Sequence, residues 1–235
     1  MIAHESVWRA NVAAETVSVE RLPERWRKQG GRALIPRILL DEIPPGFDPL
    51  GPLNKLIWSV GLLVGHGISS CDRISIGAKS PLTGGVKESN GGGSTGLRLS
   101  RLGIRALILE GAPSDAGWRL LRLSTEGGVF EPADELAGLG VDAAAQRLRE
   151  RYGPKVGIAL IGPGGEMGLR AAGVQNLDKD GAASRICARG GLGAVMGSKR
   201  VKAIVIDASW GETPPLADAT MFKAGRKHYT QKLQA

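Results

Sequence analysis

The sequence predicts an α+β protein built as a duplicated, β-rich domain whose two halves are related by a pseudo-two-fold axis. Three observations support this prediction. Short hydrophobic runs of strand length recur between turn-forming residues. Two glycine-rich segments each lead through a short helix-capable run into a hydrophobic strand. The hydrophobic content of 42% is that of a globular chain, and 235 residues suffice for one large core or two small ones.

The duplication rests on two pairs of similar stretches. GGSTGLRLSRLGIRALIL resembles GGLGAVMGSKRVKAIVI, and aligning their strands places Gly93 against Gly190 and Gly96 against Gly193. NKLIWSVGLLVG and PKVGIALIGPGG each place a lysine before a hydrophobic strand that ends in a glycine turn. The spacing of about 100 residues is far too long for a solenoid repeat. We therefore expect half-repeats at about residues 1–104 and 105–210.

The first half begins with alternating residues that predict a hairpin and continues with a helical region broken by Gly30-Gly31 and Pro36. Its expected elements are the hairpin strands 7–12 and 16–20, helical pieces within 23–41, strands 56–63 and 73–78, and a short helix over 94–102. A further strand is expected at 106–110, at the start of the second half. KSPLTGGVKESNGGGSTG, residues 79–96, is expected to be a glycine-rich loop. Such a loop either follows the shape of a ligand or is only a turn.

The second half shows the same alternation of strands and turns. Residues 141–152 have helical spacing, with one apolar stripe and a charged opposite face. The expected strands are 118–124, 156–161, 170–175 and 203–207, and the second glycine-rich segment is 188–199. Residues 211–235 are expected to form a linker and the start of a truncated helical region, with a basic helix over 221–233.

The net charge of +8 and the pI near 9.8 suit nucleic acid, phosphates or an acidic partner. The basic residues are scattered rather than clustered, which favours a solvated basic surface over nucleic-acid binding. No apolar run reaches the roughly 18 residues of a membrane span, and the start of the chain lacks the apolar core of a signal peptide. A cytoplasmic location without a membrane partner is the default expectation.

The glycine-rich segments have a chemical use. A glycine turn at the start of a helix exposes unpaired backbone N–H groups, and glycine allows close approach of a ligand. Lys79, Lys87, Arg185, Arg189 and Lys199 lie near the two turns in sequence. Two anion sites are one interpretation, and two tight turns of a β-rich domain are the other. Neither segment is a phosphate-binding P-loop or a dinucleotide-binding motif.

The chain resembles the N-terminal domain of the tungsten- or molybdenum-dependent aldehyde:ferredoxin oxidoreductases. The residues that show the resemblance are KSPLTGG (79–85), SNGGG (89–93), ALILEG (106–111), IGPGGE (161–166) and ARGGLGAVMGSKRVKAIVI (188–206). The similarity extends over roughly residues 8 to 210. One departure is GLLVGH after the strand ending near Gly61, where the family usually has GPLTGT. Ile186 and Cys187 are bulkier than the family's residues at those positions.

The resemblance implies a platform for one metal held by the dithiolene sulfurs of two pterins, with a magnesium ion linking the pterin phosphates. It implies that Arg73 lies between a pterin and a 4Fe-4S cluster. The residues expected at the cofactor by motif match are Arg73, Asn90, Gly91, Gly92, Gly93, Arg185, Ile186, Ala188, Arg189, Gly190 and Gly191. Cys71 and Cys187, the two cysteines of the chain, do not match the family's cluster ligands, so no metal ligand is expected here.

The family converts aldehydes to carboxylic acids and passes electrons through the cluster to ferredoxin. The resemblance therefore implies a pterin-binding platform that needs C-terminal cluster-binding domains or a subunit, with a homo-oligomer possible. We expect no turnover from the 235 residues alone, and an apolar patch where the cluster-binding portion docks. The alternative is a non-catalytic pterin-binding or scaffold subunit of a larger complex.

Overall fold

A computed structural model describes residues 5–234 and contains two six-stranded sheets. The first sheet has the order β2-β1-β6-β3-β4-β5, and the second has the order β11-β10-β9-β12-β7-β8. The first consists of β1 (Ser6–Asn11), β2 (Thr16–Arg21), β3 (Leu56–Val60), β4 (Ile74–Lys79), β5 (Val86–Gly91) and β6 (Ile104–Glu110). The second consists of β7 (Arg119–Ser124), β8 (Gly127–Pro132), β9 (Gly157–Leu160), β10 (Val174–Asn176), β11 (Arg185–Cys187) and β12 (Val201–Ile206).

The two sheets are copies of one arrangement, which confirms the predicted duplication. In each sheet one strand pair is parallel, β1 with β6 and β7 with β12, and every other pair is antiparallel. Each parallel pair also has a register shift at the same place, where Arg105 in β6 and Lys202 in β12 are left unpaired. A bulge is a conserved structural device rather than an accident, so its recurrence supports a common origin of the halves.

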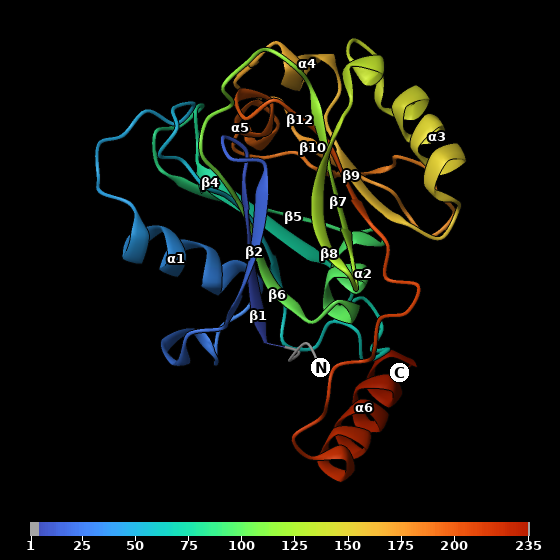
Figure 1. Ribbon diagram of the computed structural model, residues 1–235. Coiled ribbons are helices and arrows are strands. Elements are labelled where there is room, and N and C mark those ends of the chain that lie inside the picture. Colours follow the sequence, from blue (N-terminus) through green and yellow to red (C-terminus); the bar gives the residue numbers. More distant parts are fainter. Residues whose placement is uncertain (1–4, 235) are drawn as a thin grey trace.

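The helices form layers around and between the sheets (Figure 1). They are α1 (Leu34–Glu42), α2 (Thr95–Arg101), α3 (Val141–Tyr152), α4 (Pro163–Glu166), α5 (Leu192–Ser198) and α6 (Ala219–Gln234), with short 3-10 turns at 24–26, 31–33 and 134–136. Helix α1 covers the outer face of the first sheet, and α3 covers the second. Helices α2 and α5 each contact strands of both sheets.

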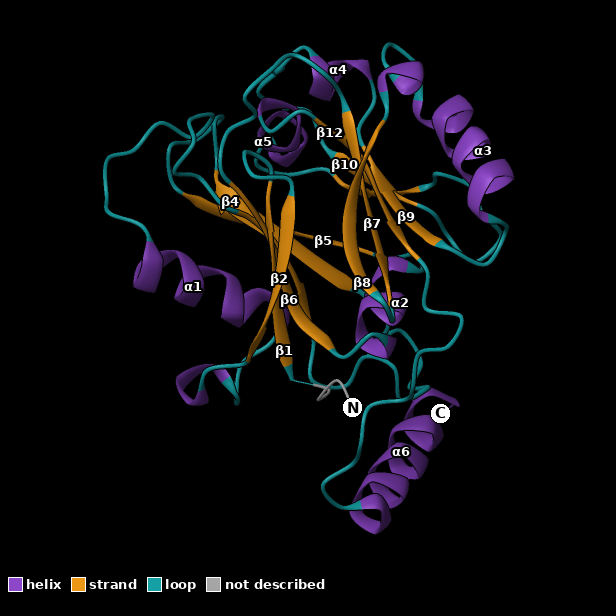
Figure 2. Ribbon diagram, in the orientation of Figure 1, coloured by secondary structure: helices purple, strands orange, loops and turns teal. Residues whose placement is uncertain are grey.

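The sequence explains these layers through alternation along the strands. In β3 and β6, Trp58, Leu107 and Leu109 face the large core between the sheets, whereas Ile57 and Ile108 face the smaller core under α1. Strands buried on both faces read as continuous hydrophobic runs. The sheets also approach each other at both edges, β2 against β8 and β5 against β11. Figure 2 shows the strands of the two sheets in orange, with the helices around them in purple.

Several predicted boundaries were wrong for identifiable reasons. Pro36 does not break the helix, because it lies in the first turn of α1, where its missing N–H is not needed. The expected loop 79–96 contains a strand, β5, because the polar residues KESN pair with β4 at the sheet edge. Strand β6 (Ile104–Glu110) pairs with β1 and β3 and so completes the first sheet.

Three further elements differ from the expectation or were missed. Edge strands β8 and β11 were not predicted, since β8 begins with two glycines and β11 has only three residues, too few to show a strand pattern. The strand expected at 170–175 begins later, as β10. Helix α6 extends away from the two sheets (Figure 1). None of the helices within residues 5–234 combines the length and the apolar character that a bilayer crossing requires.

Candidate functional site

The two glycine-rich segments meet where the halves join. Strand β5 and strand β11, each at the edge of its sheet, lie in contact. The N–H of Arg189 donates to Ser89 Oγ at 3.3 Å. A Cβ on Gly91 would lie 2.7 Å from Cys187 Sγ, so glycine is required for the approach of the two strands. The fold therefore brings residues about 100 positions apart in the sequence to one seam, as a duplicated half-domain predicts.

The first glycine segment is fixed by Arg73 and Asn90. Arg73 donates through Nε to Asn90 Oδ1 and through a terminal nitrogen to the Asn90 carbonyl at 3.4 Å. Asn90 in turn donates to Ser75 Oγ at 3.2 Å. A Cβ on Gly92 would lie 3.6 Å from Arg185 Cδ and 3.9 Å from a terminal nitrogen of Arg73. Gly92 thus leaves open the space between the two arginines.

The second glycine segment begins α5. Gly190 and Gly191 have φ values of +80° and +69°, a left-handed backbone that glycine adopts without steric cost. A Cβ on Gly190 would lie 2.6 Å from Cβ of Lys87, and one on Gly191 would lie 2.0 Å from the Arg170 carbonyl oxygen. Gly190 lies beside Lys87, which is five residues before Gly92 along β5 and its end. The glycines of the two segments, Gly92 and Gly190, are therefore separated by roughly 16 Å along the seam.

The backbone donors divide into used and free groups. The N–H of Ser94 donates to the Leu177 carbonyl at 2.9 Å, and that of Gly193 donates to the Ala172 carbonyl at 2.8 Å. These two donors are therefore unavailable to a ligand. The N–H groups of Gly92, Gly93, Gly190 and Gly191 have no hydrogen-bond acceptor within residues 5–234. Free N–H groups at a left-handed turn form an anion-binding concavity.

A buried amide holds the seam together. Thr95, the first residue of α2, donates to Asn176 Oδ1 at 2.9 Å, and Asn176 donates to the Arg185 carbonyl at 3.2 Å. Asn176 is fully buried. The motif comparison did not identify Asn176, which precedes the second glycine-rich segment in the sequence. Asn176 links the helix after the first segment to the strand before the second.

The charge around the seam is positive. Arg73, Lys87, Arg185 and Arg189 are exposed. In the part of the chain that the structure describes, none of these four side chains forms a salt bridge. Ile186 and Ala188 are exposed on the same segment, whereas Cys187 points inward. Burial raises the pKa of Cys187 to about 12, so its thiol stays protonated at neutral pH.

A cleft of about 540 Å³ opens beside the first segment, between the two halves. Its lining includes four of the predicted residues, Arg73, Gly92, Gly93 and Arg185. Arg98, Lys179 and Asp178 line it as well and were not predicted. Aligning the two repeats would have singled out Arg98, because the alignment places this arginine opposite Val195. Gly190, Gly191 and Arg189 do not line the cleft. Gly190 and Gly191 are buried, with Gly190 against Lys87, whereas Arg189 is exposed.

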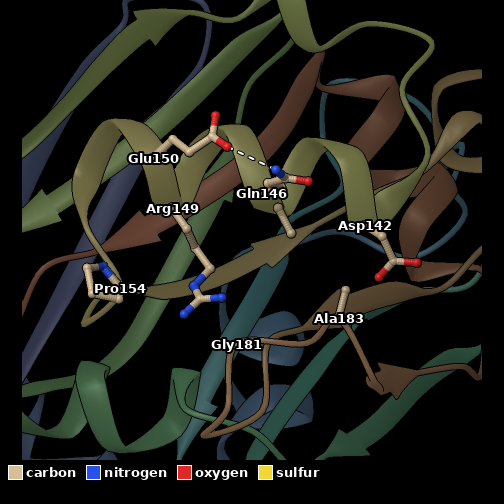
Figure 3. Close-up of a pocket in the computed structure, with 8 residues that line it drawn as sticks. Asp142, Gln146, Arg149, Glu150, Pro154, Gly181 and Ala183 are labelled. Atoms are coloured by element: carbon tan, nitrogen blue, oxygen red, sulfur yellow. Dashed lines mark hydrogen bonds between the residues drawn. The ribbon is translucent and has the colours of Figure 1, made fainter.

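A second pocket of about 410 Å³ lies beside α3 (Figure 3). Figure 3 shows Arg149 pointing from α3 towards the loop at Gly181, and Gln146 bonded to Glu150 at 3.0 Å. No predicted residue lines this pocket. Among residues 5–234, no group of three or more His, Cys, Asp or Glu side chains is placed to hold a metal ion.

Comparison with known proteins identifies similar sequences and similar solved structures. The family described as aldehyde ferredoxin oxidoreductase, N-terminal domain, matches residues 7–208. The tungsten-containing aldehyde ferredoxin oxidoreductase of Pyrococcus furiosus is 35% identical over 229 residues, which are 96% of this chain and 36% of that protein. The corresponding enzyme of Thermococcus kodakarensis is 34% identical over 229 residues, with the same coverage of 96% and 36%.

Two other matches have different names. The aliphatic sulfonate oxidoreductase, WOR-like subunit, of Pyrococcus furiosus is 29% identical over 220 residues, 87% of this chain and 34% of that protein. The active site complex BamBC of benzoyl coenzyme A reductase, solved with 1,5-dienoyl-CoA, superposes with a TM-score of 0.80 at 27% identity, covering 87% of this chain and 31% of that one. The chain spans about a third of the length of the relatives it matches.

Proposed function

Because the chain belongs to the aldehyde ferredoxin oxidoreductase family through its N-terminal domain, we propose that it is the pterin-binding platform of a tungsten- or molybdenum-dependent oxidoreductase. The observation that supports this most is the meeting of the two glycine segments at one seam, with four free backbone N–H groups and unpaired cations around them. A ligand that carries two phosphate groups needs two anion-binding sites of this kind on one face of the protein.

The residues present fit a cofactor with two phosphate-bearing pterins. Gly92 leaves a space between Arg73 and Arg185 that a side chain would fill. Guanidinium groups bind phosphate through paired N–H donors. In this proposal Arg73, Asn90 and Gly91 to Gly93 hold one pterin, while Arg185, Ile186 and Ala188 to Gly191 hold the other. A magnesium ion would offset the charge of the two phosphates between them.

When bound, the metal and its pterins supply the redox chemistry, and the protein supplies binding and orientation. We propose that the complete protein oxidises an aldehyde to a carboxylic acid with ferredoxin as electron acceptor. The two cysteines of this chain cannot ligate a 4Fe-4S cluster, which takes four. The cluster ligands are therefore assigned to a further domain or subunit.

A second candidate is a subunit of a larger complex that acts on another substrate. The relatives that favour it are the WOR-like subunit of an aliphatic sulfonate oxidoreductase and the BamBC complex of benzoyl coenzyme A reductase. A non-catalytic pterin-binding or scaffold subunit is the corresponding alternative without turnover. Exposed Ile186, Val86 and Leu82 near the seam offer apolar surface to a docking partner.

The test is the cofactor content of the chain purified from a host that makes tungsten and molybdenum cofactors. We expect pterin fluorescence after oxidation, together with metal by mass spectrometry. Gly92→Val and Arg185→Met should each reduce both contents at least tenfold. Arg21→Met, an exposed arginine at the far end of β2, is the matched control. A folded wild-type protein with neither pterin nor metal would contradict the platform and favour the scaffold.

A second experiment separates platform from enzyme. The purified 235-residue chain should show no aldehyde-dependent reduction of a dye, and coexpression with a cluster-binding partner should restore it. Dye reduction by the isolated chain would refute the proposed division of labour. Sulfonates and coenzyme A thioesters tested beside aldehydes distinguish the two candidate functions.

A further inference from the structure

We propose that the cleft between the halves contains an additional anion subsite at Arg98, which binds a phosphoryl group. Arg98 lies on α2 and lines the cleft together with Arg73 and Arg185. This proposal rests on the cleft and its charges, and it does not depend on the proposed cofactor platform.

The first observation is a break in the internal symmetry. Helices α2 (Thr95–Arg101) and α5 (Leu192–Ser198) are equivalent in the two repeats, and their alignment places Arg98 opposite Val195. Val195 is fully buried in the core. A helix position that is apolar in one half therefore holds a guanidinium in the other. Arg98 is half-buried, and removing a charge from water costs stability unless the charge is paired, so a ligand for that charge is the physical explanation.

The second observation is how the Arg98 side chain is accommodated. A Cβ on Gly157 would lie 2.8 Å from Arg98 Cγ, so the bare backbone at the start of β9 makes room for the arginine stem. Arg98 Nε is buried and has no hydrogen-bond partner within residues 5–234. A buried donor without an acceptor is costly and rare in native proteins. A bound anion would supply the acceptor.

The third observation is the balance of charge in the cleft. Its cations are Arg73, Arg98, Lys179 and Arg185, and its carboxylates are Asp72 and Asp178. Both carboxylates already accept bonds within the protein, Asp72 from the Gly65 N–H at 2.8 Å and Asp178 from Ser184 Oγ at 2.6 Å. Neither forms a salt bridge with a cleft arginine among residues 5–234, whereas Lys179 pairs with Asp180 at 3.8 Å. The three arginines are therefore the cations of the cleft that an anion would meet.

The remaining groups near Arg98 agree with an anion site. Burial lowers the pKa of Arg98, and nearby Arg101 lowers it further, whereas Asp207 opposes the change. An arginine stays charged despite such shifts. The two arginines outnumber the single carboxylate that acts on Arg98, so the local charge favours an anion.

Phosphoryl is the chemical class that fits these donors. A guanidinium offers parallel N–H groups to phosphate oxygens, and the serine hydroxyls of Ser70 and Ser94 line the same cleft. The volume of about 540 Å³ is that of a small-molecule pocket. The phosphoryl group has two possible sources, the phosphate of a pterin held at Gly92 or a separate phosphorylated compound.

The experiment is isothermal titration of the purified chain with inorganic phosphate and then pyrophosphate, at low ionic strength. We expect one saturable site whose affinity falls at least tenfold in Arg98→Met and less in Arg98→Lys, which keeps the charge but loses the paired donors. Arg21→Met is the control and should bind as wild type. Thermal unfolding of each variant checks that the fold is intact. Absence of saturable binding, or an Arg98→Met variant that binds as wild type, would overturn the subsite.

A second arm identifies the source of the phosphoryl group. Pterin content is measured for wild type and Arg98→Met from a cofactor-competent host. Loss of pterin together with loss of phosphate binding assigns the group to the cofactor, whereas retained pterin assigns it to a separate compound. If wild type carries no pterin but still binds phosphate through Arg98, the proposed platform fails and the subsite stands.

Discussion

Arg105 and Lys202 are the unpaired residues at the same bulge of the two equivalent sheets. Their environments differ. Lys202 is fully buried and donates to Glu166 and to the Leu139 carbonyl at 3.0 Å. Arg105 is half-buried, and burial lowers its pKa, which Glu5 partly opposes. One bulge therefore contains a buried ion pair that ties β12 to α4, and the other does not.

Lys202→Met should destabilise the fold by about 3–5 kcal/mol, because removal of one partner leaves the Glu166 carboxylate buried and uncompensated. Urea unfolding followed by circular dichroism measures the change. Arg105→Met at the equivalent bulge is the control and should cost much less. The double variant Lys202→Met/Glu166→Gln should recover most of the loss, and a double variant as unstable as the single one would contradict this explanation.

The pH dependence of stability should report Lys199. Lys199 is almost fully buried and donates to the Gly111 carbonyl at 2.9 Å. Burial lowers the pKa of Lys199 to about 8, which Glu110 opposes and Lys55 assists. The folded state therefore loses this proton at a lower pH than the unfolded state. The free-energy cost of burying the charged ammonium is complete below pH 8 and decreases as the pH rises towards the ordinary pKa of lysine.

Between these pH values the unfolding free energy of wild type should rise relative to Lys199→Met by up to about 1.4 kcal/mol per pH unit. Chemical unfolding of both proteins at pH 7, 8, 9 and 10 provides the comparison, since shared titrations cancel in the difference. Parallel pH profiles would show that Lys199 titrates normally.

The two cysteines should differ sharply in reactivity. Burial raises the pKa of Cys187 to about 12, whereas Cys71 is only partly buried and its pKa rises less far. Because the thiolate is the reactive form, iodoacetamide at pH 8 should label Cys71 and leave Cys187 unmodified. Peptide mass spectrometry locates the label, and labelling in denaturant, where both react, is the control. Rapid modification of Cys187 in the folded chain would mean that the seam opens.

One glycine from each segment should separate the effect on folding from the effect on ligand binding. A Cβ on Gly193 would lie 2.3 Å from the Gly173 carbonyl oxygen, so Gly193→Ala should cost roughly 1–3 kcal/mol through overpacking. Gly92→Ala meets only ordinary contacts and should leave the unfolding midpoint nearly unchanged while it reduces cofactor content. Equal losses of stability in the two variants would contradict the distinction between Gly193, where a side chain would clash, and Gly92, where it would not.

The sequence by itself determined the strands with hydrophobic patterns, the helix over Val141–Tyr152 and the internal duplication, because burial period and glycine spacing are local signals. It also determined the family, since ARGGLGAVMGSKRVKAIVI is long and specific. Only the tertiary structure decided that Gly91 packs on Cys187, that β5, β8 and β11 are edge strands, and that Ser94 and Gly193 use their N–H groups internally. Gly91 with Cys187 and Ser94 with Leu177 are contacts between segments far apart in the sequence. The docking of two folded halves, rather than any local pattern, sets such contacts.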